Sequence, residues 1–127
     1  MRRTLLAVAV ATVMAAMPAG AHHSFARYYL EDQSITIEGE VHEFQYRSPH
    51  AILVFAARTP DGGTRTYEAE WSNPRRLGSQ GVDEGTLKPG DFVLVTGSPG
   101  RAGSEHKVHL KGIRRPADGW SWTGRRR

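Results

Sequence analysis

The histidines are the side chains of this 127-residue chain with the most chemistry to offer. An N-terminal histidine is a special ligand, since its free amine and its ring nitrogen can chelate one cupric ion together. Nitrogen ligands in a square-planar array suit copper(II) best among the divalent metals. The six histidines are His22, His23, His42, His50, His106 and His109. Their use as metal ligands depends on what processing does near His22 and on how the fold places the others.

The first 21 residues predict a cleavable secretory signal peptide. Arg2 and Arg3 form a short positive region, residues 5–17 are apolar, and residues 18–21 supply a helix breaker and a small-x-small cleavage site. The apolar stretch is shorter than the roughly 20 residues of a good membrane span, so we expect no transmembrane span after cleavage. The mature protein is therefore expected to be periplasmic or secreted.

The cleavage position decides which cupric site could form. Cleavage after Ala21 makes His22 the first residue, and a second imidazole would then complete a brace around the copper. Cleavage one residue earlier leaves His23 third in the chain, where the amine, two deprotonated backbone amides and the ring bind the metal. His50, just after a turn, or His42, on the first predicted strand, could supply the ligand from the folded domain. The predicted metal ligands are His22, His23 and His50.

The composition argues against several other kinds of site. The chain has no cysteine, which excludes a disulfide framework and a thiolate metal site. Removal of Arg2 and Arg3 with the leader lowers the formal charge from +4 to +2, and three arginines stand at residues 125–127. The near-neutral body disfavours nucleic acid as a partner. No nucleophile elbow, phosphate loop or zinc-protease helix is present, so we expect no enzyme, although a copper brace can in principle support oxidative chemistry.

Residues 34–113 have the hydrophobic pattern of a small all-β domain. Alternating apolar and polar residues indicate a long first strand, with a bulge or bend at Gly39. A Pro-Asp-Gly-Gly turn predicts a hairpin between the second and third strands. Ser72 or Asn73 can cap a short helix that has Pro74 at its first position. The predicted strands cover residues 35–46, 50–57, 64–71, 92–97 and 107–113.

The order of these elements predicts the topology. Three strands, a helix and two more strands, with a long bent first strand, indicate a five-stranded Greek-key barrel of the OB type. A β-sandwich or an open meander is the competing topology. Residues 22–33 are expected to form an irregular lead-in segment. Residues 114–127 are expected to be a basic, disordered tail.

Several short motifs resemble a known family. They are Ala21-His22-His23-Ser24-Phe25-Ala26, Glu38-Gly39-Glu40-Val41, Ser48-Pro49-His50-Ala51, Leu87-Lys88-Pro89-Gly90-Asp91 and Val93-Leu94-Val95-Thr96-Gly97-Ser98-Pro99. Together they resemble domain-of-unknown-function family 6152, a set of small exported bacterial proteins. The chain has Ser48 where the family usually has asparagine before Pro-His, which keeps the imidazole. The resemblance implies export and a small β domain, and it implies no activity.

Two functions of different classes follow. The first is an exported periplasmic binding or accessory domain that binds copper(II) through the mature N-terminal histidines. The alternative is a metal-free OB-like module that binds a periplasmic protein or glycan across its second and third strands, where Tyr46, Arg47 and Trp71 would be exposed. His22-His23 would then be only a polar start to the mature chain.

Three further features have a simpler interpretation. The carboxylate pairs Glu38/Glu40 and Glu68/Glu70 each lie on one strand face, and we expect both faces to be solvated. His109 is expected to face solvent between two lysines.

Overall fold

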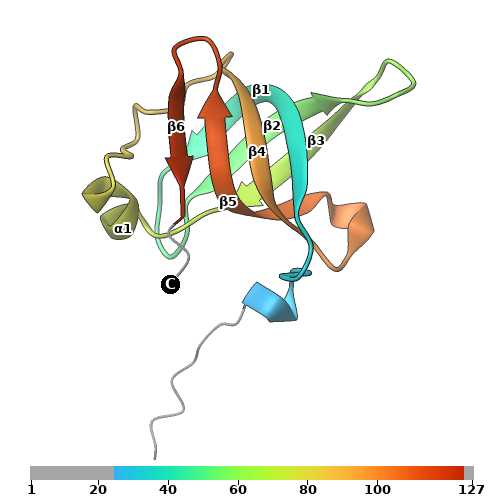
Figure 1. Cartoon of the computed structure of the whole chain (residues 1–127), viewed down its shortest axis with the longest axis horizontal. Helices are drawn as coiled ribbons and strands as arrows, with labels where there is room; N and C mark the ends of the chain where they lie inside the picture. The colour runs from blue at the N-terminus through green and yellow to red at the C-terminus, as the bar shows by residue number, and fades with distance from the viewer. Residues whose placement is uncertain (1–24, 125–127) are drawn as a thin grey trace, which may run out of the picture.

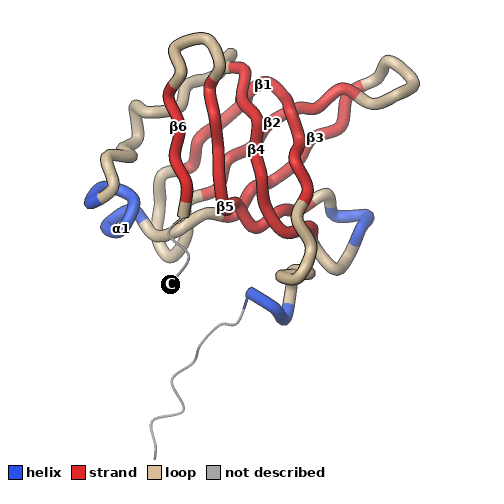
Figure 2. The backbone as a smooth tube through the Cα atoms, in the orientation of Figure 1, coloured by secondary structure: helices blue, strands red, loops and turns tan. Residues whose placement is uncertain are grey.

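The computed structural model describes residues 25–124 of the chain (Figure 1, Figure 2). Figure 2 shows that strands are the main regular secondary structure of this part, with helices only in short segments. The strands are β1 (Ile35–Gln45), β2 (Ile52–Arg58), β3 (Thr64–Glu70), β4 (Phe92–Pro99), β5 (Lys107–Arg115) and β6 (Trp120–Thr123). The helical segments are η1 (Phe25–Arg27), α1 (Pro74–Ser79) and η2 (Gly103–Glu105).

Five of the strands close into a barrel of mixed direction. The sheet has the order β3-β2-β1-β4-β5-β6, and β3 also pairs in parallel with β5, which closes the ring. The other pairs are antiparallel, and β6 lies outside the ring against β5 (Figure 1). The predicted all-β, OB-like barrel of five strands with one short α-helix is confirmed, and it carries one additional outer strand.

The first strand serves both halves of the barrel because it bends. Residues 35–40 pair with β4, and residues 40–45 pair with β2, with a register shift between Val41 and Glu43. A Cβ atom at Gly39 would lie 2.4 Å from the carbonyl oxygen of Ala56, so a side chain at this position would force the two strands apart. The mid-strand glycine thus allows the close approach of β1 and β2 where the first strand bends.

The interior of the barrel is apolar. Alternate strand residues point inward, as the period-two pattern predicts. Leu77 of α1 and Leu87 of the following loop complete the core, and both are buried. The helix begins as predicted, because Asn73 Oδ1 accepts a hydrogen bond from the backbone N–H of Arg76 and Pro74 is the first helical residue. The buried strand residues include Val41, Leu53, Phe55, Ala69, Val93, Val95, Val108, Leu110 and Ile113.

The expectation of a disordered tail from residue 114 was wrong. β5 continues to Arg115, and β6 pairs with its second half. Trp122 packs edge-on against the buried Trp71, with 4.9 Å between the ring centroids, and its indole N–H donates to Gln80 (3.0 Å). The tryptophans of β6 thus add apolar area to the packed part of the molecule. The neighbouring arginines had led to the expectation of a basic, disordered tail. Residues 125–127 lie outside the described residues.

Residues 25–33, which we call the N-terminal strap, pack across one end of the barrel. Tyr29 is only 3% exposed, and it forms an isolated bridge with Gly100. Leu30 donates its backbone N–H to the carbonyl oxygen of Pro99 (2.9 Å). The predicted signal peptide, residues 1–21, and the predicted ligands His22 and His23 lie outside the described residues. Within residues 25–124, no helix has the length and apolar character needed to cross a membrane.

Candidate functional site

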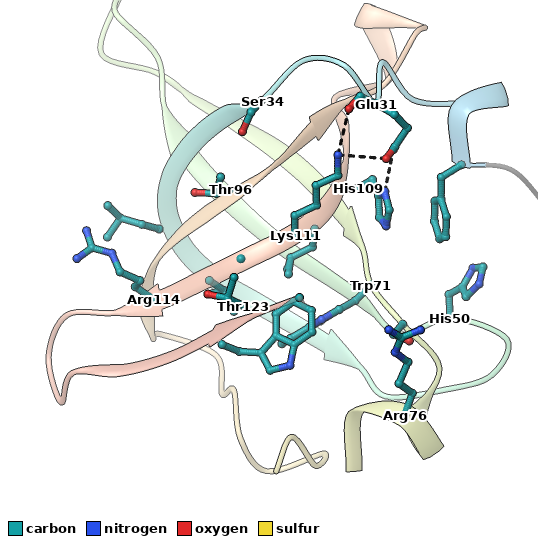
Figure 3. A pocket seen from close by; sticks show the side chains of 18 of the residues that line it. Glu31, Ser34, His50, Trp71, Arg76, Thr96, His109, Lys111, Arg114 and Thr123 are labelled. Atoms are coloured by element: carbon teal, nitrogen blue, oxygen red, sulfur yellow. Dashed lines mark hydrogen bonds and ion pairs between the residues drawn. The ribbon is translucent and has the colours of Figure 1, made fainter. Parts of the chain in front are cut away.

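Two imidazoles lie against the ring of Phe25 at one end of the barrel, and each is hydrogen-bonded to a carboxylate. We call this group the histidine cluster: Phe25, Glu31, His50, Glu70 and His109. His50 immediately precedes the second strand, while Glu70 and His109 are neighbours in the parallel pairing of β3 with β5. Figure 3 shows Glu31, His50 and His109 at one side of the hollow that adjoins the cluster. The barrel closure therefore brings together residues from four separate segments.

His50 is held by a carboxylate that is itself held by the strap. Its Nδ1 lies 2.6 Å from Oε1 of Glu70, and the Tyr29 hydroxyl donates to Oε2 of the same carboxylate at 2.5 Å. Burial, followed by the hydrogen bond to Glu70, raises the pKa of Tyr29 well above its ordinary value, which keeps the phenol protonated as a donor. Glu70 thus fixes the ring of His50, and no other described residue forms a hydrogen bond with Nε2.

His109 has a similar arrangement on the other side of Phe25. Its Nδ1 lies 2.8 Å from Oε1 of Glu31, and Lys111 Nζ lies 3.1 Å from Oε2. Burial by itself would raise the pKa of Glu31, but the hydrogen bonds from His109 and Lys111 outweigh it, so the net shift is downward. The carboxylate therefore remains ionised over a wide pH range and orients the imidazole.

The expectation that His109 faces solvent was wrong. Phe25 stacks on its ring with 3.7 Å between centroids and 2° between planes, and the His109 side chain is only 19% exposed. The same Phe25 ring contacts His50, at 5.3 Å between centroids. The strap therefore covers a strand face that the alternation of residues 107–111 had marked as solvated. Glu70 is half-buried for the same reason, so only Glu68 of that pair is exposed as expected.

The other histidines lie outside the cluster. His42 is exposed on β1, and His106 lies in the left-handed region (φ 49°) beside the ring of Tyr67. Within residues 25–124, no three histidine or carboxylate side chains converge closely enough to hold a metal ion. Residues 25–124 thus offer single oriented imidazoles, and a metal site that used one of them would need ligands from outside these residues.

The surface proposed for the metal-free alternative differs from the expectation. Trp71 is 1% exposed and belongs to the core. Tyr46 is half-buried, and its hydroxyl lies 2.8 Å from the carbonyl oxygen of Pro74 and 2.9 Å from that of Val82, so it anchors α1 and the following turn. Only Arg47 is exposed. Two of the three residues predicted for partner binding on this face therefore stabilise the fold instead.

A groove of about 1310 Å³ begins at the histidine cluster and follows β5 toward β6 (Figure 3). Its lining is evenly polar and apolar in character, and it includes Phe25, His50 and His109 at the cluster end. The strap, the segment that leads into α1, and the strands β4, β5 and β6 all contribute to it. Further lining residues are Ser34, Asn73, Arg76, Thr96, Lys111, Arg114, Trp122 and Thr123.

Sequence reasoning found His50 and missed its surroundings. Glu31, Tyr29 and His109 belong to segments far from residue 50, and they meet only because β3 pairs with β5 and the strap crosses that pair. One signal was present, since Phe25, Tyr28 and Tyr29 are an unusual concentration of aromatic residues in a lead-in segment. It indicated that this segment packs against something, without indicating where.

Comparison with known proteins assigns the chain to a family. Searches of the curated proteins and of the solved structures found no match. The model of a family described as "Family of unknown function (DUF6152)" matches residues 9–109, a range that contains every residue of the histidine cluster. The match agrees with the resemblance seen in the sequence motifs. The chain belongs to this family of unknown function, DUF6152.

Proposed function

We propose that the protein is an exported accessory domain of the periplasm that binds copper(II) through His22 and His23, with His50 as the ligand from the barrel. One observation carries the proposal: the His50 ring is fixed through Nδ1 by Glu70 and contacts Phe25, which follows His23 by two residues. The short distance along the chain from His23 to Phe25 supports a site that the N-terminal histidines share with this oriented imidazole.

The length of chain between His23 and Phe25 supports His50 as a ligand from the barrel. An extended chain spans at most about 3.3–3.6 Å per residue, so the Cα atom of His23 is within roughly 7 Å of that of Phe25. The Phe25 ring lies against His50 and His109. Either imidazole is then accessible to a metal held at the N-terminus, and His50 is the more exposed of the two, with 33% of its side chain exposed against 19%.

The contacts of His50 are those of a metal ligand held in place. Histidines that bind metals usually donate the second ring N–H to a carboxylate or a carbonyl oxygen, which fixes the ring and raises its basicity. Glu70 supplies that carboxylate at 2.6 Å, and the hydroxyl of Tyr29 holds its other oxygen. Copper(II) is the favoured ion because the expected ligands are an amine, imidazoles and backbone amides.

The two cleavage positions give different cupric sites. If the mature chain begins at His22, its amine and ring form a chelate that leaves coordination positions for His50. If the chain begins at Ala21, the amine, two backbone amides and the His23 ring would hold the copper ion, and His50 would be only an additional ligand. The mass of the mature protein isolated from a periplasmic extract identifies the cleavage site and tests the export itself.

A titration with cupric ion tests the proposal. The mature protein, expressed with its own leader, is titrated while its paramagnetic resonance spectrum is recorded. We expect one equivalent to bind with a type-two spectrum and nitrogen coupling. The double variant H22A/H23A should lose this tight binding, whereas the matched double variant H42A/H106A, which also removes two imidazoles, should keep it. Tight binding that persists in H22A/H23A would contradict the proposal.

A further inference from the structure

We propose that the groove along β5 is a binding site for an acidic oligosaccharide, a chain of sugar rings that carry carboxylates. This inference does not depend on copper. The volume of about 1310 Å³ exceeds the usual 300–1,000 Å³ of pockets for small molecules. Its size fits an extended ligand of several units better than a single small molecule.

Two free cations favour an anionic ligand. Among the described residues, no carboxylate lies within ion-pair distance of the guanidinium groups of Arg76 or Arg114, and both side chains are exposed. Figure 3 shows Arg114 at one end of the drawn groove and Arg76 toward the other. The lining contains two carboxylates, Glu31 and Asp32. Glu31 is already paired with Lys111, so Asp32 is the carboxylate of the lining that would still repel an anion. Arginine binds carboxylates with two parallel hydrogen bonds, so each guanidinium suits one acidic sugar.

The rest of the lining suits sugar rings. Hydroxyl and amide groups stand along the groove and can exchange hydrogen bonds with sugar hydroxyls. Trp122 lines the groove with its indole N–H bonded to Gln80, which fixes the orientation of the ring. A fixed aromatic ring gives an apolar surface at little entropic cost on binding. The hydroxyl and amide residues are Ser34, Ser72, Asn73, Thr96 and Thr123.

An oligosaccharide is favoured over an extended peptide because β5, the strand that the groove follows, has no free edge there. A peptide that binds by strand addition takes its main-chain hydrogen bonds from an unpaired edge. Here Gly112, Ile113 and Arg114 pair with β4 on one side and with β6 on the other. A ligand that lies along β5 must therefore bind mainly to side chains, which is how sugars are commonly held.

Calorimetric titration of the mature protein with oligogalacturonate tests this inference. A chelator keeps the protein free of metal, so the result is independent of the copper proposal. We expect saturable binding that weakens as salt is added, because the contacts are between charges near the surface. R76Q and R114Q should each weaken binding by about tenfold or more, the cost of losing one charge-assisted hydrogen-bonded pair. R75Q is the matched control, since Arg75 is exposed on α1 and does not line the groove.

Four other results would overturn the inference. A neutral oligosaccharide of the same length should bind at least tenfold more weakly, and equal binding of both would remove the role of the arginines. Binding of poly-glutamate without binding of oligogalacturonate would make the ligand an acidic peptide. Binding that R76Q, R114Q and R75Q weaken equally would place the ligand outside the groove. The absence of binding at millimolar oligogalacturonate would also contradict the assignment.

Discussion

The N-terminal strap and β6 both lie outside the five-stranded ring, and they are attached to it by different interactions. The strap contributes a polar network in which Tyr29 donates to Glu70, and Glu31 binds His109 and Lys111. β6 is attached by its backbone ladder with β5 and by the packing of Trp122 on Trp71. One segment therefore orients ionisable side chains, while the other covers apolar area.

This difference suggests that the strap belongs to a binding site and that β6 supports the fold. Hydrogen-bonded carboxylates at the strap fix the directions of two imidazoles, which a metal site requires and an apolar contact cannot provide. Contacts between the aromatic rings at β6 depend little on pH or salt, and they close the side of the barrel where Trp71 lies. We expect the strap to govern metal binding and β6 to govern stability, and the predictions below test each assignment.

The largest effect on stability is expected from Trp122. Replacing it with alanine removes a half-buried ring from Trp71 and should lower the free energy of unfolding by about 2 kcal/mol, below the 3–5 kcal/mol of a fully buried tryptophan. Urea denaturation measures the change. Tyr28 is the control aromatic on the strap, because its side chain is 59% exposed, and Y28A should change stability by less than about 0.5 kcal/mol. Equal losses in the two variants would contradict the role given to β6.

A smaller loss is expected when the hydroxyl of Tyr29 is removed. Y29F keeps the ring but leaves Glu70 without its donor from the strap, which should cost about 1.5 kcal/mol, as for a hydrogen bond to a charged group. The same variant should weaken the orientation of His50, so copper affinity should fall although no ligand is removed. A variant with normal copper affinity and lower stability would show that the strap network supports the fold alone.

The smallest effect is expected from Glu31, and it depends on pH. The pKa of Glu31 is lowered below its ordinary value of 4.5 in the folded protein, so its ion pairs stabilise the fold above that pH and lose their effect as the pH falls below it. At neutral pH, E31Q should lower the free energy of unfolding by about 0.5–1 kcal/mol, the range of a partly exposed ion pair. The wild type and E31Q should become equally stable in acid. A difference that persists unchanged at pH 3 would contradict this account.

Much of the barrel was predictable because its signals are local. Alternation marked the strands, Gly39 marked the bend of β1, and the Thr59 to Gly63 turn fixed the β2–β3 hairpin, which pairs in the expected antiparallel register. Asn73 and Pro74 marked the start of α1, because Asn73 caps the helix and Pro74 suits its first position. In each case the residue type suits a backbone conformation without reference to distant parts of the chain.

The outer strand and most of the candidate site depend on distant contacts. Trp120 and Trp122 have strand spacing, but Trp122 packs on Trp71, about fifty residues earlier in the chain. His109 looks solvated from its lysine neighbours and is covered by Phe25, from the other end of the chain. Neither contact leaves a trace in local periodicity, because one depends on the pairing of β6 with β5 and the other on the position of the strap.

The most direct test of the copper proposal compares two single variants of the mature protein, H50A and H42A. Each loses one imidazole, but only His50 has its Nδ1 held by a carboxylate and its ring against Phe25. Pulsed paramagnetic resonance of the cupric protein counts the bound imidazoles. For a mature chain that begins at His22, we predict that H50A loses one imidazole from the spectrum and at least about tenfold in copper affinity, while H42A matches the wild type. An H50A spectrum identical to that of the wild type would show that the barrel does not contribute a ligand, and would contradict the account.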